Sequence, residues 1–216
     1  MQLTGYGITL RRLTEHDLEL VRQKRNSEQV RPFMQFREEI TPDMQRAWFV
    51  SIDNEHNNYF LIIHNGLSVG LISGAEIDWE KMETNNGGLF IWESSLWGTP
   101  VPLYAALLLT ELSFLIGFRK SFVRVLPGNK RAILFNTQIG YERVQDQPES
   151  DLHKYVLTPE KFFSVTTAAR TQVKALFPEK FRCVIDDPQH ATSRKIIAAY
   201  QKLRPEDQAQ LDFTVE

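Results

Sequence analysis

The chain has 216 residues, of which 42% are hydrophobic, and its 25 basic and 27 acidic side chains give a formal net charge of −2. This hydrophobic content supports a packed core and excludes extensive disorder, while the charge argues against a nucleic-acid binder or a cationic membrane binder. The single cysteine, Cys183, excludes an internal disulfide framework and is typical of a reducing compartment.

The first third of the chain predicts a strand, two helices and a hairpin. The opening MQLTGYGITLRR lacks the regions of a signal peptide, and GITLRRL within it alternates as a half-buried strand does. Thr14 and Asp17 resemble a capping box for a helix that ends near Arg25, and Thr41 is expected to cap a second helix, TPDMQRAWFVSI. NNYFLIIHNGLSVGLISGAEID then predicts two strands joined by a tight turn at Asn65-Gly66.

The middle of the chain alternates strands and helices. GGLFIWES and SFVRVL predict strands, residues 102–117 an apolar helix, and KRAILFNTQI a short amphipathic helix. Polar residues interrupt the apolar helix, so it is not a membrane span, and we expect a soluble, cytoplasmic protein. GYERVQD and HKYVLTP predict a closing hairpin. The order β-α-α-β-β-β-α-β-α-β-β indicates a mixed α+β fold with locally parallel pairing in its second half.

Beyond Thr158 the sequence predicts only helices, in TPEKFFSVTTAARTQVKALF, DPQHATSRKIIAAYQKL and RPEDQAQL. We therefore expect a domain of residues 1–157 and a helical C-terminal extension of residues 158–216. The apolar side chains of this extension require burial, which makes a detached tail the least favoured arrangement. Covering a sheet face, forming a homodimer contact and closing over an acceptor groove are its three open roles.

The stretch SLWGTPVPLYAALLL predicts a loop that leads into a helix, an arrangement that holds phosphate groups through free backbone N–H groups. Pro100 and Pro102 each remove one such donor. Gly98, Thr99 and Val101 keep theirs. The stretch therefore predicts a weakened anion site.

The element order, ending in NKRAILFNTQIGYERV, resembles the GNAT superfamily of acyl-CoA-dependent N-acyltransferases. The residues that fit its Asn-x-x-Ala and Gly-Phe motif are Asn129, Ala132, Asn136, Gly140 and Tyr141. A second stretch, RNSEQVRPFMQF…ITPDMQRAWF, resembles the ribosomal-protein and nucleotide-sugar acetyltransferase branches through Arg25, Asn26, Ile40, Thr41, Trp48 and Phe49. Gln45 stands where these branches usually carry histidine.

The resemblance implies a mostly antiparallel sheet, flanked by helices, whose central parallel strands splay apart between residues 89–94 and 121–126. The pantetheine arm of acetyl-CoA, the implied co-substrate, would lie in the splay, and a loop that keeps one of three signature residues would hold its pyrophosphate. The implied cofactor-binding residues are Ile91, Trp92, Gly98, Thr99, Val101, Asn129 and Asn136. No metal is expected, because the histidines show no ligand spacing.

Attack by an amine requires its deprotonation, so a carboxylate or a water relay is expected near the splay. Glu93 is the first candidate base, followed by Glu76 and Asp78, although Glu93 also fits an ordinary strand-end carboxylate. Asn136 takes the place of a tyrosine acid found in many members; its amide can bond the thiol or pantetheine but cannot exchange a proton. Asn129 fits a helix cap as well as a ligand contact.

The expected acceptor is the primary amine of a small molecule, with Arg25, Asn26, Arg31 and Trp48 as candidate substrate-binding residues. An amino sugar or a nucleotide-linked amino sugar is one candidate acceptor, and a protein N-terminus or lysine is another. The weakened loop around Gly98 also fits a GNAT-fold binding or structural protein without turnover.

Overall fold

The computed structural model of the protein describes residues 1–145 and 151–216. Within these residues, one ten-stranded sheet has the order β10-β9-β1-β2-β3-β4-β5-β6-β8-β7. Its strands are β1 (Gln2–Gly5), β2 (Ile8–Arg12), β3 (Asn58–His64), β4 (Leu67–Asp78), β5 (Glu83–Ile91), β6 (Lys120–Val125), β7 (Glu142–Arg143), β8 (His153–Leu157), β9 (Phe181–Ile185) and β10 (Leu211–Val215). Parallel pairing joins β5 to β6 and β9 to β10, and antiparallel pairing joins the other neighbours. The predicted mixed α+β fold is confirmed.

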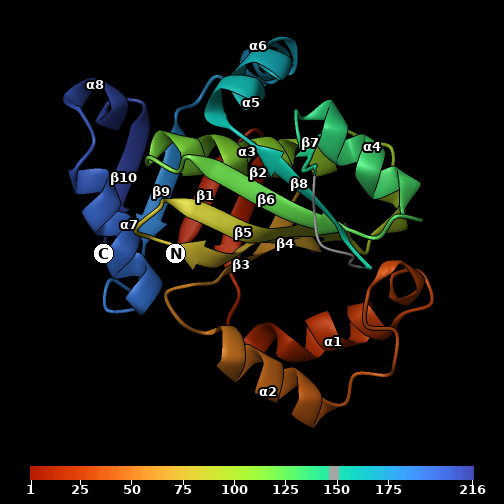
Figure 1. Ribbon diagram of the computed structural model, residues 1–216. Helices are drawn as coiled ribbons and strands as arrows, with labels where there is room; N and C mark the ends of the chain where they lie inside the picture. The colour runs from red at the N-terminus through yellow and green to blue at the C-terminus, as the bar shows by residue number, and fades with distance from the viewer. Residues whose placement is uncertain (146–150) are drawn as a thin grey trace.

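Helices cover both faces of this sheet. The helices are α1 (Leu18–Asn26), α2 (Pro42–Ile52), α3 (Val101–Leu115), α4 (Lys130–Gln138), α5 (Pro159–Val165), α6 (Thr167–Leu176), α7 (Ala191–Gln201) and α8 (Pro205–Gln208), with short 3₁₀ turns at Glu15–Asp17, Arg31–Phe33 and Ser94–Leu96. Figure 1 shows α1 and α2 on one face, α3 to α6 on the other, and α7 and α8 beside β9 and β10. Each face has its own core, the larger one under α3 and the smaller one under α1 and α2.

Local sequence signals place several of these elements. The Asp17 carboxylate accepts hydrogen bonds from the N–H and the hydroxyl of Thr14, at 2.9 and 2.8 Å, as a capping residue does. Thr41 caps α2 by accepting from the N–H of Met44 at 3.2 Å. Asn65 and Gly66 both have positive φ, 50° and 77°, in the turn between β3 and β4. Each of these local predictions is confirmed.

The closing hairpin forms as predicted in the described residues, where β7 pairs with β8 at Glu142↔Val156 and Arg143↔Tyr155. Its predicted first strand also included Asp146, which lies outside the described residues. No helix in the described parts of the chain is long and apolar enough to cross a membrane.

Residues 158–216 differ from the purely helical prediction, because they also contribute β9 and β10. β9 pairs with β1, a strand that was not predicted, and β10 pairs with β9, so the extension lengthens the central sheet. The burial pattern of FRCVI in β9 alternates, but over five residues only. So short a pattern indicates a strand only once its partner is known. The division of the chain at residue 157 stays a prediction.

The pairing between β5 and β6 ends partway along the strands. Its register runs through Glu83↔Lys120 and Thr84↔Ser121 to Gly87↔Val123, and the described pairing goes no further, although β5 continues to Ile91. The two strands are close where they last pair, since a Cβ on Gly87 would lie 3.1 Å from Val123 Cγ1. The residues after Gly87 on β5 and after Val123 on β6 therefore border a gap in the sheet, which we call the β5–β6 gap.

Candidate active site

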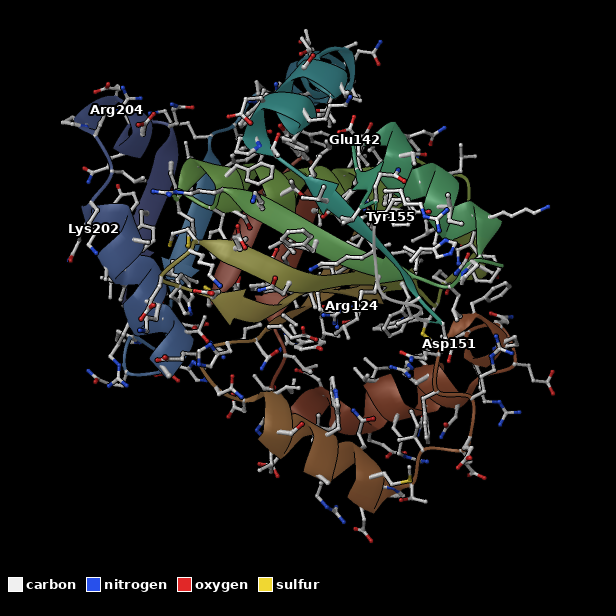
Figure 2. All side chains as sticks on the ribbon, viewed as in Figure 1. Arg124, Glu142, Asp151, Tyr155, Lys202 and Arg204 are labelled. Carbon is white, nitrogen blue, oxygen red and sulfur yellow. The ribbon has the colours of Figure 1, made fainter. Side chains whose placement is uncertain are left out.

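A cleft of about 1600 Å³ joins the two faces of the sheet through the β5–β6 gap. On one face it forms what we call the α1–α2 compartment, lined by Arg25, Gln45, Trp48, Tyr59, Glu76, Phe90 and Arg124. On the other face it forms the α3–α4 compartment, lined by residues that include Gly98, Thr99, Leu103, Asn129, Arg131 and Asn136. In Figure 2 the side chain of Arg124 lies between the sheet and the α1–α2 pair. Two ligands entering from opposite faces could therefore meet inside the sheet.

The β5 border of the gap presents main-chain donors. Trp92 donates its N–H to Val69 O at 3.0 Å, so the alternation of the antiparallel β4–β5 ladder directs the N–H groups of Leu89 and Ile91 away from β4. The carbonyl oxygen of Ile91, on the same side, accepts from the indole Nε1 of Trp97 at 2.9 Å. The gap therefore offers N–H groups suited to a carbonyl oxygen or an amide.

The loop before α3 has fewer free donors than its length suggests. Thr99 donates its N–H to Leu96 O at 3.1 Å, and Tyr104 donates to Pro100 O at 2.9 Å. The N–H of Val101 makes a long contact of 3.4 Å to Thr99 Oγ1. Within the described residues, the N–H groups of Gly98 and Leu103 have no acceptor. The loop thus keeps two fully free donors at the positive end of α3.

Arg131 adds a positive charge next to this loop, and the sequence analysis missed it. Its guanidinium lies over the ring of Trp97, 4.9 Å from the centroid, and it lines the cleft from α4. Within the described residues it forms no ion pair. The arginine follows directly after Lys130 in the predicted helix, but nothing in the sequence shows which of the two faces the cleft.

The predicted cofactor-binding residues divide into two groups. Ile91, Gly98, Thr99, Asn129 and Asn136 line the cleft, whereas Trp92 and Val101 do not. The indole of Trp92 is buried in the smaller core and donates to Ser68 O at 2.8 Å.

The two asparagines of the α3–α4 compartment both make contacts within α4. Asn129 caps α4 by accepting from the N–H of Ala132 at 3.1 Å, as the alternative interpretation expected. Asn136 donates its amide Nδ2 to Ala132 O at 2.8 Å. Both contacts leave the side chains at the cleft wall, so a ligand role for each stays a prediction.

Only one of the three candidate carboxylates lines the cleft. Glu76 accepts from Nη1 and Nη2 of Arg124 at 2.8 and 3.0 Å, and these hydrogen bonds hold the pKa of its carboxyl below the ordinary value. Its backbone is left-handed, with φ of 52°, and its N–H donates to Asn57 Oδ1 at 3.3 Å. Glu93 is exposed and accepts from Ser95 Oγ at 3.0 Å, and Asp78 pairs with Lys81 at 3.2 Å. The role of each carboxylate in catalysis stays a prediction.

Two of the four predicted acceptor-binding residues line the cleft and two do not. Arg25 lines the α1–α2 compartment, with its guanidinium 5.7 Å from the ring centroid of Phe90, and Trp48 lines it while contacting Tyr59 edge to face at 5.2 Å. Asn26 instead holds the main chain of Ile40, donating to its carbonyl at 2.9 Å and accepting from its N–H at 2.8 Å. Arg31 is not among the lining residues.

A chain of hydroxyl groups lies where β5 and β6 last pair. Thr84 Oγ1 donates to Ser121 Oγ at 3.0 Å, and Ser121 Oγ lies 2.7 Å from the hydroxyl of Tyr141. Burial raises the pKa of Tyr141 to about 12, so this phenol stays neutral at physiological pH. In the described residues, no three His, Cys, Asp or Glu side chains come together as ligands for a metal ion.

Comparison with known proteins identifies the family to which this arrangement belongs. Residues 8–142 match the acetyltransferase (GNAT) domain family. An uncharacterized protein of Methanocaldococcus jannaschii is 24% identical over 147 residues, or 67% of this chain, and the match spans only 30% of that protein's own length.

Solved structures agree on the fold. FdhC, described as a nucleotide-linked sugar GNAT, matches with a TM-score of 0.65 at 18% identity, over 79% of this chain and 97% of its own. Spermidine N-acetyltransferase from Vibrio cholerae, solved with CoA and spermine, matches with a TM-score of 0.60 at 18% identity, over 74% of this chain and 99% of its own. The family match covers more than half of the sequence, and the parted strands and flanking helices agree with it; the chain belongs to the GNAT acetyltransferase family.

Proposed function

We propose that this protein is an acyl-CoA-dependent N-acetyltransferase that transfers the acetyl group of acetyl-CoA to a primary amine of a small molecule. The observation that carries the proposal is the single cleft that joins both faces of the sheet through the β5–β6 gap. A direct transfer needs donor and acceptor aligned at one point, and such a gap brings them together without a covalent enzyme intermediate. Spermidine N-acetyltransferase from Vibrio cholerae, which shares the fold, was solved with CoA.

The α3–α4 compartment is assigned to the co-substrate. Acetyl-CoA supplies the acyl group as an activated thioester. The free N–H groups of Gly98 and Leu103, at the start of α3, and the guanidinium of Arg131 suit the pyrophosphate. The N–H groups of Leu89 and Ile91 border the gap, where they are placed to donate to the thioester carbonyl as negative charge develops on its oxygen.

The α1–α2 compartment is assigned to the acceptor amine, and Glu76 to its deprotonation. The lowered pKa of Glu76 keeps the carboxylate ionised at neutral pH, and the bidentate contact with Arg124 fixes its direction. An ionised carboxylate can attract the ammonium group and take its proton, directly or through a water molecule. Glu93, the first candidate from the sequence, is the weaker choice because it does not line the cleft.

Within this class, an amino sugar or a nucleotide-linked amino sugar is the first acceptor to test. The aromatic walls of Trp48 and Phe90 suit a sugar ring, and FdhC, a structural neighbour, is described as a nucleotide-linked sugar GNAT. A protein N-terminus or lysine and a binding protein without turnover are the competing functions; the second is favoured only by Pro100 and Pro102 in the loop before α3.

Two measurements test the proposal together. Acetyl-CoA at one hundred times its dissociation constant is expected to raise the free energy of unfolding by about 2.7 kcal/mol, measured by thermal denaturation. Release of free thiol from acetyl-CoA is then followed with a panel of amino sugars, polyamines and peptides. Saturable stabilisation with no turnover on any amine would favour the binding protein, and no response to any acyl-CoA would overturn the assignment of the α3–α4 compartment.

A further inference from the structure

Arg25 is a cation for which the described residues provide no anion. Neighbouring arginines are paired, Arg22 with Glu19 at 2.7 Å and Arg124 with Glu76 at 2.8 Å, but Arg25 forms no ion pair in the described chain. Burial lowers its pKa, and the titratable group that faces it is Tyr59, which is neutral at physiological pH. Phe90 covers one side of the guanidinium, and Nε has no hydrogen-bond acceptor among the described residues.

Gln45 provides a second unsatisfied donor in the wall of the same compartment. Gln45 is only 4% exposed, it is part of the cleft wall, and its buried amide Nε2 has no acceptor among the described residues. A buried polar group without a partner destabilises a fold, and this applies more strongly to a charged one. The compartment thus carries two unsatisfied donors, on adjacent helices α1 and α2, and the positive charge of Arg25, with which no carboxylate of the described residues forms an ion pair.

We infer that Arg25 and Gln45 form an oxyanion subsite, so that the acceptor of this enzyme carries a carboxylate or a phosphate group in addition to its amine. The inference rests on the proposed function and narrows its substrate class. A guanidinium and an amide N–H, both donors, match the oxygens of such a group, while Glu76 remains for the ammonium. Polyamines carry only positive charge, so we expect them to be poor acceptors of this protein. The Vibrio cholerae neighbour, by contrast, is a spermidine N-acetyltransferase.

The subsite can be tested by ligand binding, without any turnover. Inorganic phosphate and acetate are titrated separately against the protein saturated with CoA, which occupies any other phosphate site, and the melting temperature is recorded. Wild type should be stabilised by one of the two anions, and the effective anion shows whether the subsite is built for phosphate or carboxylate. Arg25→Met and Gln45→Met should abolish or weaken this response. Lys24→Met is the control: it removes one positive charge from the residue before Arg25, which does not line the cleft, and should keep the anion response.

The stability of the variants separates a binding role from a structural one. Without anion, Arg25→Met should melt no lower than wild type, because it replaces an unpartnered, half-buried cation with an apolar side chain of similar length. A lower melting temperature, or an anion response that survives in Arg25→Met, would overturn the inference, as would a wild type that responds to neither anion. The rise in melting temperature on adding CoA alone is measured first. Its absence would contradict the cofactor assignment, whatever the response to the anions.

Matched acceptors give the kinetic readout. For glucosamine 6-phosphate against glucosamine, or glycine against glycinamide, wild type should prefer the member with the oxyanion. Arg25→Met should lower kcat/KM for that member on the order of 10- to 100-fold, chiefly through KM, and by a clearly smaller factor for the neutral member. Equal losses on both members would contradict an oxyanion contact.

Discussion

Arg25 and Asn26 are adjacent in the sequence and were predicted together as substrate-binding residues, but the structure gives them different environments. The guanidinium of Arg25 lines the cleft, while the Asn26 amide makes two hydrogen bonds to the main chain of Ile40. These bonds fasten the segment that leads into α2, which carries Gln45 and Trp48 to the compartment wall. One residue of the pair thus faces the ligand, and the other positions the wall around it.

At the same scale, Glu76→Gln tests the proposed base. Glutamine can still accept hydrogen bonds from Arg124 but cannot take a proton, so kcat should fall about 100-fold or more, with CoA affinity unchanged. Because the pKa of Glu76 is held below the ordinary carboxyl value, the loss of wild-type rate that reports its protonation should occur below the ordinary carboxyl range. Steady-state rates over pH 3 to 8 measure both effects. Glu93→Gln is the matched comparison: a loss there equal to that in Glu76→Gln would return Glu93 to first place.

The loop before α3 depends on Gly98, which has φ of 88° and open space where a Cβ would stand. Gly98→Asp should abolish stabilisation by acetyl-CoA, because it adds bulk and negative charge beside the expected pyrophosphate. Gly66→Asp is the control, since Gly66 also has positive φ, 77°, and open space, but lies in the β3–β4 turn. Both should lose a similar, modest amount of stability, and only Gly98→Asp should lose CoA binding in calorimetry. Intact CoA affinity in that variant would place the cofactor elsewhere.

The start of α1 depends on the ionisation of Asp17. Burial alone would raise the pKa of this carboxyl, but hydrogen bonds from Arg11 and Thr14 outweigh it and hold the pKa below the ordinary value. The stabilisation is therefore complete above about pH 4, the unfolded value, and is lost as the pH falls through the lower folded value. Asp17→Asn should lower the free energy of unfolding by about 1–3 kcal/mol at pH 7, and urea denaturation should show the difference shrinking below pH 4. Asp43→Asn, on an exposed carboxylate 90% accessible to solvent, should show little of this trend.

How far the elements could be predicted depends on how local their causes are. Thr14, Thr41 and Asn65-Gly66 act within a few residues, so the caps and the hairpin follow from the sequence. Strand β9 is stabilised by pairing with β1, at the other end of the chain, and β10 by pairing with β9, and no local pattern reveals either partner. The β5–β6 gap was expected through the family resemblance only. The direction of Gln45 and Arg131 into the cleft depends on tertiary packing and could not be predicted.

Across the whole molecule, the extension is joined to the rest through a buried carboxylate. Glu111 of α3 is 7% exposed and contacts Arg170 at 3.3 Å and Lys174 at 2.8 Å, both on α6, as well as the hydroxyl of Tyr6. The Arg170 guanidinium also donates to Phe163 O at 3.3 Å and lies 4.8 Å from the Phe163 ring centroid. This cluster fixes α6 against α3 on the face assigned to the co-substrate.

Arg170→Met should therefore destabilise the protein as a whole. Lys174 continues to compensate Glu111, so we expect a loss of about 1–3 kcal/mol in the free energy of unfolding, measured by urea denaturation. Arg204→Met is the control, because its side chain is 71% exposed and its pairs with Glu206 and Asp207 are on the surface, where ion pairs contribute about 0–1 kcal/mol. Equal, small losses in both variants would show that α6 is held by apolar packing alone.

The burial of Cys183 gives the chain an internal reporter of opening. The thiol lies on β9, between β1 and β10, is 3% exposed, and has its pKa raised to about 12 by burial. A disulfide reagent should therefore react only when this end of the sheet separates. Because Cys183 is the sole cysteine, the absorbance change produced by such a reagent reports the reaction of this thiol alone. Its rate, compared with that of complete unfolding, would show whether the far edge of the sheet detaches by itself.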